Sequence, residues 1–258
     1  MTRLIFRGTG DSMGVPRLYC DCGVCTEARD TGMNRRLRSS LHIWDEEAGH
    51  IWIDCGPDFG EQLEAAKLRE IDTLLITHAH FDHIGGLVEW ADACRWQQKK
   101  GIAYAPTEVI PEILARFPWL SSHIDFRAFD ESIKLGKWKV FSWRVHHGKN
   151  GYAYAFRFEH LETGCKWVYC SDSIGLTGEQ QKPLVDLDLL VLGTSFYHEP
   201  FAYETRSVYD VLEALELIHK WKPKQTVLTH MSHDIDLRKQ YGLPEQVVLA
   251  VAGMTIEM

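Results

Sequence analysis

The sequence predicts an α/β protein in which two packed β-sheets carry helices on their outer faces. Three observations favour this fold class. Short apolar runs of strand length alternate along the chain with stretches of helical periodicity. Several neighbouring apolar runs are separated only by short turn-forming segments, which indicates hairpins. No internal repeat, low-complexity tract or linker interrupts the 258 residues, so we expect one domain spanning residues 1–258.

Composition excludes several classes of protein. Hydrophobic residues at 45% and charged residues at 25% are typical of globular chains. The net charge of −8 counts against a polyanion-binding surface. The N-terminus lacks the apolar core of a signal peptide, and no apolar run is long enough to span a membrane, so we expect a cytoplasmic protein. Seven cysteines, an odd number, favour metal binding over a disulfide framework.

The first half of the chain predicts a sheet flanked by three helices. A glycine-rich loop at 8–16 lacks the dinucleotide-binding and P-loop patterns, so we interpret it as a tight turn that brings backbone close to a site. Arg35, Arg36 and Arg38 form a basic run that we interpret as a solvated face. We expect an irregular rim segment at 117–130, strands at 4–6, 41–44, 50–53, 73–76 and 102–105, and helices at 58–68, 85–98 and 107–117.

The second half predicts a second sheet with one regular amphipathic helix at 207–221, which Pro223 ends. A His or an Asp follows several of the expected strands, and loops at strand ends are where catalytic residues concentrate. The strands are expected at 138–146, 152–158, 166–170, 188–193 and 225–229, and two short elements close the chain, one of them at 246–251.

One segment carries a high density of metal-binding side chains. Residues 77–83 read Thr-His-Ala-His-Phe-Asp-His and directly follow the apolar run at 73–76. Imidazole nitrogen and carboxylate oxygen are ligands for Zn²⁺, Mn²⁺ and Fe. In an extended segment alternate residues point the same way, so we expect His78, His80 and Asp82 to project together, whereas His83 begins the next turn. This loop can therefore serve two metals that lie side by side.

A second cluster lies near the N-terminus. Cys20, Cys22 and Cys25 have the spacing C-x-C-x-x-C, which lets three thiolates converge on one metal. A four-coordinate structural zinc needs one further ligand from elsewhere in the chain. Asp54 follows the strand at 50–53 and is open to two interpretations. It is either a carboxylate that holds the far N–H of a ligand histidine or a turn-capping residue.

The H-x-H-x-D-H motif at 78–83, followed by single His, Asp and His residues at strand ends, resembles the signature of the metallo-β-lactamase fold superfamily. The resemblance covers essentially the whole chain and implies a four-layer αββα sandwich. It matches Asp54 to a buried aspartate of the family, and it favours His147 over His146 because a glycine follows His147. The implied ligands of one metal are His78, His80 and His147, those of a second metal are Asp82, His83 and His230, and the bridging residue is Asp172.

The chemistry of two neighbouring divalent ions indicates that such a centre could hydrolyse a phosphodiester. Two divalent ions about 4 Å apart lower the pKa of a water molecule between them, orient a substrate and stabilise a leaving oxygen. These properties suit hydrolysis of a phosphodiester. Zinc and manganese both accept mixed nitrogen and oxygen ligands, so either metal fits.

The cysteine cluster indicates a particular family within this superfamily. Three cysteines at this spacing after a G-T-G-x-x-x-G-V-P loop resemble the PhnP family of phosphoribosyl cyclic-phosphate phosphodiesterases. In that family the fourth ligand lies three residues after the last active-site histidine, which corresponds to His233 here. The resemblance implies a homodimer and, in a loop at about residues 16–26, a structural zinc held by Cys20, Cys22, Cys25 and His233.

The sequence departs from that family at one position. The family has a histidine just before its last long helix, whereas the region around Thr205 has none. His198 lies earlier in the same segment, so we expect Asp82 or His198 to protonate the leaving group. Arg17 and Lys149 are expected to contact the phosphate.

The predicted function is therefore a dinuclear-metal phosphodiesterase acting on a small, cyclic phosphodiester. Two alternatives stay open. A tRNA 3′-end processing endonuclease shares the metal ligands, but it needs a basic arm that the sequence does not contain, and the net charge of −8 counts against a nucleic-acid partner. A non-catalytic or carrier protein of the pyrroloquinoline-quinone biosynthesis type shares the cysteine motif but need not keep all seven active-site ligands.

Overall fold

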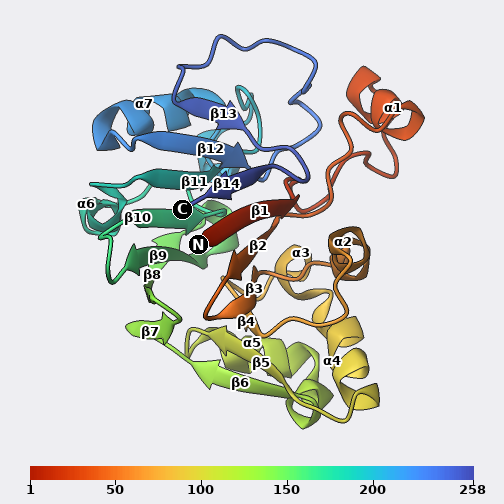
Figure 1. Cartoon of the computed structure of the whole chain (residues 1–258). Helices are drawn as coiled ribbons and strands as arrows, with labels where there is room; N and C mark the ends of the chain where they lie inside the picture. The colour runs from red at the N-terminus through yellow and green to blue at the C-terminus, as the bar shows by residue number, and fades with distance from the viewer.

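Two seven-stranded mixed sheets face each other in the computed structural model, which describes residues 1–258. The first sheet has the strand order β14-β1-β2-β3-β4-β5-β6 (Figure 1). Its strands are β1 (Thr2–Gly8), β2 (Ser40–Asp45), β3 (Gly49–Ile53), β4 (Thr73–Leu75), β5 (Gly101–Ala105), β6 (Ile124–Ala128) and β14 (Thr255–Glu257). The predicted hairpin is confirmed, because β2 and β3 pair in antiparallel fashion.

The second sheet has the strand order β13-β12-β11-β10-β9-β8-β7. Its strands are β7 (Ser132–Leu135), β8 (Trp138–His146), β9 (Tyr152–His160), β10 (Lys166–Cys170), β11 (Leu189–Gly193), β12 (Gln225–Thr229) and β13 (Val247–Leu249). Strands β8, β9 and β10 form an antiparallel meander, whereas β10, β11 and β12 are parallel. The carboxyl ends of β8, β10, β11 and β12 therefore lie at one edge of this sheet.

Helices on both outer faces complete the predicted sandwich. On the first sheet lie α2 (Phe59–Ala66), α4 (Leu87–Trp96) and α5 (Val109–Arg116), and on the second lies α7 (Val211–Trp221) (Figure 1). The shorter elements are α1 (Gly23–Asp30), α3 (Phe81–Ile84), α6 (Gly178–Gln181), η1 (Pro118–Ser122), η2 (Gly148–Asn150), η3 (Lys182–Leu184) and η4 (Tyr203–Thr205). None of these helices combines the length and the apolar character that crossing a membrane requires.

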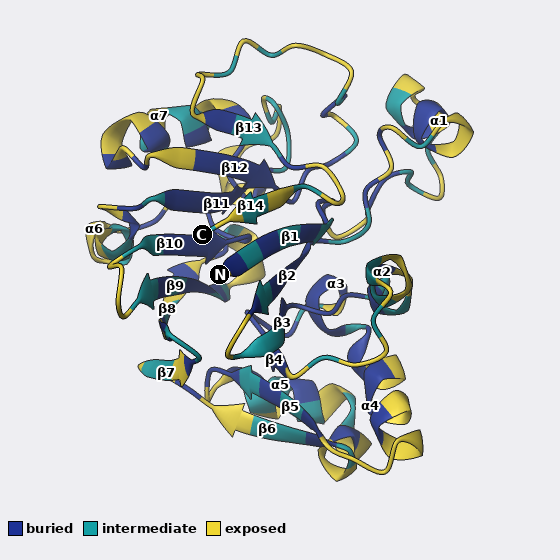
Figure 2. Cartoon of the chain, viewed as in Figure 1, coloured by how far each residue is buried: buried dark blue, intermediate teal, exposed yellow.

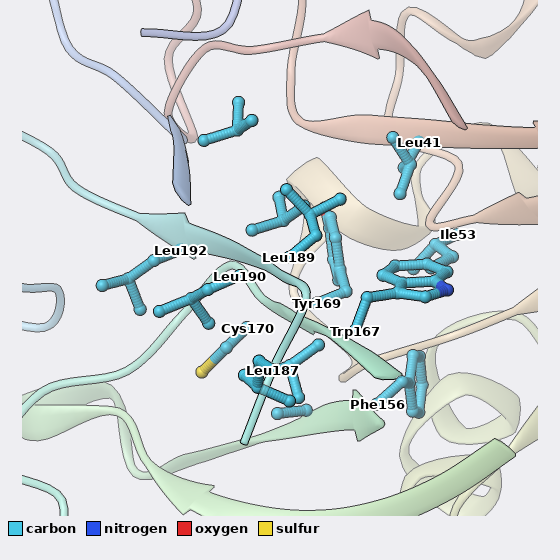
Figure 3. Packing of buried hydrophobic residues seen from close by; sticks show 14 of the residues in the cluster. Leu41, Ile53, Phe156, Trp167, Tyr169, Cys170, Leu187, Leu189, Leu190 and Leu192 are labelled. Carbon is cyan, nitrogen blue, oxygen red and sulfur yellow. The ribbon is translucent and has the colours of Figure 1, made fainter. Parts of the chain in front are cut away.

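The alternation of side chains along each strand divides them between two apolar cores. In β3, Ile51 and Ile53 point into the core between the sheets, whereas Trp52 points toward α2 and α4. Figure 3 shows the core between the sheets, where Leu41 and Ile53 lie opposite side chains of the second sheet such as Trp167. The central strands are buried along most of their length, and the helices expose their outer sides (Figure 2).

The glycine-rich loop after β1 packs backbone against backbone, as predicted. Gly10 forms β-bridges with Arg38 on one side and with Met231 on the other. A Cβ at Gly8 would lie 1.8 Å from the carbonyl oxygen of Arg38, so only glycine fits there. The loop thus lies directly against the segment that follows β12.

Two predictions about secondary structure are wrong, namely the irregular segment at 117–130 and the start of the helix at 207. The segment at 117–130 is not an irregular rim, because it contains η1 and the edge strand β6, which runs parallel to β5. Residues 124–127 alternate apolar and polar side chains, but the aromatic cluster before them obscured this pattern. The helix predicted to begin at 207 begins at Val211, because Asp210 caps it in a reciprocal capping box with Glu213.

The interpretation of the basic run as a solvated face is wrong for Arg36. Its side chain is only 1% exposed, whereas Arg35 is half exposed and Arg38 pairs with Asp58. The guanidinium of Arg36 is buried because it donates to two main-chain carbonyl oxygens, those of Ser232 and Ile235. A run of like charges in the sequence therefore divides here into an exposed arginine, Arg35, a partly buried one, Arg38, and a buried one, Arg36.

Candidate metal centre

The histidine-rich segment leaves the end of β4 and enters α3. His78 and His80 lie in the extended part, and the Nε2 atom of His78 is 2.9 Å from Nδ1 of His80. Asp82 and His83 lie on α3, so Asp82 groups with His83 rather than with the two extended histidines. The distance from Asp82 Oδ2 to His83 Nε2 is 3.1 Å. One short segment thus divides its four donors between two directions.

Three donors from the second sheet complete the cluster. His147, Asp172 and His230 follow the carboxyl ends of β8, β10 and β12. The carboxylate of Asp172 lies between the others, with Oδ1 3.2 Å from His230 Nε2 and 3.6 Å from His147 Nε2, and with Oδ2 3.3 Å from His83 Nε2. The centre therefore lies between the two sheets, at the edge where these strands end.

The donors form three sets whose ligand atoms lie within 4.8 Å of one another. These sets are His78, His80 and His147; His78, His83 and Asp172; and Asp82, His83 and His230. Several buried ligand atoms have no hydrogen-bond partner, namely His83 Nε2, Asp172 Oδ2 and His230 Nε2. Buried polar atoms are normally paired. Unpaired atoms directed at one another across a shared space fit divalent metal ions, and mixed imidazole and carboxylate donors suit zinc or manganese.

The far nitrogen of most of these histidines has a fixed partner. Asp54 Oδ2 is 2.7 Å from His83 Nδ1, which is the arrangement predicted for a carboxylate behind a ligand histidine. The carbonyl oxygen of Ser207 is 2.7 Å from His147 Nδ1, and Thr77 Oγ1 is 2.9 Å from His78 Nδ1. These contacts fix each ring so that the other nitrogen faces the centre.

Asp54 and His230 have left-handed backbone conformations, with φ of 59° and 58°. Residues other than glycine rarely adopt positive φ, and such strain is typical of functional sites. At Asp54 the conformation directs the carboxylate at Thr77, which donates to it from its backbone N–H and its hydroxyl, both at 2.8 Å. At His230 it turns the chain out of β12 beside the centre.

Burial and neighbouring charges give the donors different protonation states. Burial favours neutral rings at His83 and His230, but the carboxylates beside them outweigh it and raise the pKa of both histidines, so each must lose a proton when it binds metal. Burial lowers the pKa of His78, His80 and His147, so these rings are neutral, which is the form that coordinates metal. Burial opposes the charge of Asp172, but the surrounding histidines, His230 first among them, outweigh this effect and hold its pKa below the usual range. Asp172 is therefore an anionic donor.

The cysteine cluster and His233 form a second, separate centre. Cys20 and Cys22 precede α1, Cys25 lies on α1, and His233 lies three residues after His230. The three sulfur atoms lie 3.3, 3.5 and 3.4 Å from Nδ1 of His233. A tetrahedral zinc with Zn–S of about 2.3 Å and Zn–N of about 2.0 Å separates sulfur from nitrogen by about 3.5 Å. The four side chains could thus hold zinc without moving.

The other predicted residues lie in varied surroundings. Arg17 is mostly buried and pairs with Asp11 at 2.5 Å. Lys149 has an exposed side chain on η2, two residues after His147. His198 is exposed, and its Nδ1 lies 3.4 Å from Asp210, so Nε2 is free.

Sequence reasoning missed Asn150, whose Nδ2 lies 3.5 Å from Nε2 of His147, the nitrogen that faces the centre. It also missed Ser207, which acts through its main-chain carbonyl, and the buried Arg36. The turn sequence Gly148-Lys149-Asn150-Gly151 held a signal for Asn150, because a short turn brings its polar residues back beside the histidine before it.

Comparison with known proteins places the fold and the site in a family. A family model described as a β-lactamase superfamily domain matches residues 50–231, which is most of the chain. The chain therefore belongs to the β-lactamase superfamily, as the motif predicted. A crystal structure described as a new diphosphatase from the PhnP family is 27% identical, with a TM-score of 0.87, and the match covers 100% of this chain and 98% of that chain.

Two further relatives extend the comparison. An octanoyltransferase of Porphyromonas gingivalis is 27% identical over 252 residues, which are 93% of this chain and 48% of that protein, so the chain spans about half the length of this curated relative. The zinc-bound PqqB of Methylobacterium extorquens is 14% identical, with a TM-score of 0.81 over 99% of this chain and 100% of that chain. At this identity PqqB shows a shared fold alone.

Proposed function

We propose that this protein is a metal-dependent phosphodiesterase that hydrolyses a small, cyclic phosphodiester. The observation that carries the proposal is the convergence of five histidines and two aspartates on one space, with unpaired buried ligand atoms directed into it. The chain belongs to the β-lactamase superfamily, whose motif implies that such a set binds metal, and the similar PhnP-family structure is described as a diphosphatase.

In this proposal His78, His80 and His147 hold one divalent ion, and Asp82, His83 and His230 hold a second. Asp172 reaches both sets through its two carboxylate oxygens, so it would bridge the ions. When bound, two such ions polarise phosphoryl oxygens and lower the pKa of a water molecule. Two carboxylates offset only half of the charge of two divalent ions, so the loaded site is cationic and attracts a phosphate.

The residues around the centre supply binding and proton transfer. The amide of Asn150 lies beside the metal-facing nitrogen of His147, where it can donate to a phosphoryl oxygen. The exposed ammonium group of Lys149 adds attraction for an anionic substrate.

Asp210 orients His198 through Nδ1, which leaves Nε2 free to give a proton to the leaving alkoxide, with Asp82 as the alternative donor. Arg17 would contact phosphate only by leaving Asp11.

The Cys20, Cys22, Cys25 and His233 centre would hold one structural zinc that keeps the N-terminal loop beside the active site. A homodimer remains part of the proposal through the PhnP resemblance. The proposed metal load is therefore three ions for each chain, two in the active site and one in the cysteine centre.

Phosphorus NMR tests the proposed substrate class. Protein loaded with manganese is incubated with 5-phosphoribosyl 1,2-cyclic phosphate, a linear phosphodiester, a diphosphate ester and a tRNA precursor. We expect ring opening of the cyclic diester, with loss of turnover in the Asp172→Ala and His230→Ala variants. Cleavage of tRNA alone would favour the nuclease, and an inactive protein that binds a single ion would favour the carrier alternative.

A further inference from the structure

The buried arginine of the basic run lies between the two metal centres. Arg36 is 1% exposed, and its Nη2 donates to the carbonyl oxygens of Ser232 at 2.9 Å and Ile235 at 2.8 Å. The segment that it holds carries His230 of the active centre and His233 of the cysteine centre. No carboxylate lies within ion-pair distance of its guanidinium, and its Nε and Nη1 have no hydrogen-bond partner.

The main chain of Arg36 is tied to the cysteine centre. Its N–H and carbonyl each pair with Val15, both at 2.9 Å, as two strands of a short antiparallel bridge. Val15 in turn packs against Cys25 and Ala28 of α1 in a small apolar cluster. Because Val15 packs against α1 and is hydrogen-bonded to Arg36, a shift of α1 moves the backbone of Arg36.

The side chain of Asn34, two residues before Arg36, also binds the loop that follows β12. Asn34 is fully buried; its Nδ2 donates to Asp236 at 3.0 Å, and its Oδ1 accepts the N–H of Leu237 at 2.8 Å. At the other end, Glu27 of α1 accepts the N–H groups of Met33 and Asn34. Contacts thus run without a gap from the cysteine-bearing helix through residues 34–36 to the loop that follows β12.

The position of His230 depends on this loop. His230 has a left-handed backbone, and neither of its ring nitrogens has a hydrogen-bond partner. His78, His83 and His147 are oriented by a Thr hydroxyl, an Asp and a Ser carbonyl respectively, whereas His230 has no such partner. Its ring is therefore placed by its main chain, and Arg36 fixes that main chain two residues further on.

A buried guanidinium without an ion pair is destabilising, because its desolvation is repaid only in part by hydrogen bonds. Burial lowers the pKa of Arg36 to about 10, which expresses this penalty. An arginine here is better explained by what it holds in place than by stability. Both bonds come from one terminal nitrogen, Nη2, which the rigid guanidinium plane holds in a fixed position, whereas the ammonium group of lysine ends a flexible stem.

We propose that Arg36 is a positioning residue that couples the two centres, so that an intact cysteine centre raises the metal affinity of the active centre through the loop at 230–235. This inference rests on the metal assignments of the proposed function. It does not depend on the substrate, because metal affinity is its readout.

The test measures the affinity of the active centre for manganese by competition with a chelator, with turnover of a phosphodiester as a second readout. The variants are Arg36→Met and Arg36→Lys, and the matched control is Arg35→Met, which removes a neighbouring exposed arginine. We expect about ten- to a hundredfold weaker manganese binding in both Arg36 variants, the range typical of residues that orient metal ligands, and no change in Arg35→Met. Circular dichroism checks folding, and Arg36→Lys carries the test if Arg36→Met does not fold.

A double-mutant cycle separates coupling from a general loss of structure. Cys25→Ser disrupts the cysteine centre, and we expect it to weaken manganese binding about tenfold in the wild-type background but less than twofold beside Arg36→Lys. Equal losses in both backgrounds, or wild-type affinity in the Arg36 variants, would overturn the coupling. Wild-type protein that binds no manganese at the active centre would instead refute the proposed function.

Discussion

Asp54 is the side chain whose replacement tests the structure of the centre most directly. It is fully buried and accepts three hydrogen bonds, from Thr77 N–H and Thr77 Oγ1 at 2.8 Å and from His83 Nδ1 at 2.7 Å. In Asp54→Asn an NH₂ group replaces one of the two acceptor oxygens. Whichever way the amide points, at least one buried donor then faces another donor.

The size of the effect follows from these contacts. Hydrogen bonds to a charged acceptor contribute about 1.5–3 kcal/mol each, and a buried donor left unpaired costs about 1–3 kcal/mol. We therefore expect Asp54→Asn to lower the free energy of unfolding by about 2–4 kcal/mol. His83 also loses the carboxylate that orients it, so we expect the metal affinity of the active centre to fall about ten- to a hundredfold.

The matched control is Asp58→Asn. Asp58 is also mostly buried and accepts from the backbone N–H of Arg38 at 2.7 Å and from its Nη1 at 2.9 Å, but it contacts no metal-ligand candidate. Urea unfolding measures stability, and chelator competition measures metal affinity. We expect both variants to lose stability and only Asp54→Asn to lose metal. Equal metal affinity in the two variants would refute the role assigned to Asp54.

Three further predictions follow from particular contacts. Burial, and then the charge of Arg7, lowers the pKa of His42 to about 3. The unfolded state therefore binds more protons than the folded state between about pH 3 and 6.5, so stability falls as the pH falls through this range, and His42→Phe should flatten the slope by up to about 1.4 kcal/mol per pH unit in urea titrations. Arg206→Met leaves Glu213 and Glu199 without their buried partner, so urea unfolding should show a loss of about 3–5 kcal/mol, with weaker metal binding because the Ser207 carbonyl behind His147 shifts. Asn150→Ala removes an amide beside the centre without replacing a predicted ligand, so steady-state kinetics should show kcat reduced about tenfold or more with metal content unchanged, and a change confined to KM would contradict the transition-state contact.

The parts of the fold that the sequence predicts are those that depend on local pattern. Alternation of apolar residues located β2, β3 and β8, and the dense spacing at 78–83 located four of the seven donors. The edge strand β6 was missed because its alternation is brief and follows a run of aromatic residues. The start of α7 was misplaced because apolar spacing continues through Val208 although the chain turns at Asp210.

The parts of the site that the sequence does not reveal depend on contacts between distant segments. Arg36 lies about two hundred positions before the carbonyls that it binds, and nothing in an Arg-Arg-Leu-Arg run distinguishes the buried member. Ser207 contributes through its main chain, so its side-chain type carries no signal. The positive φ values of Asp54 and His230 are not predictable from the sequence, because Asp and His adopt this conformation more often than most residues but only in a minority of cases, and the surrounding packing decides where.

The spacing of His230 and His233 has a consequence for the order in which the protein matures. These two residues are the last donors along the chain, and each completes a different centre. A ribosome that has released residues 1–229 has therefore supplied six of the seven active-site donors and three of the four in the cysteine centre, yet neither set is complete. The next four residues complete both. Neither proposed centre can therefore be complete before a late stage of synthesis, when both sheets have nearly all of their strands.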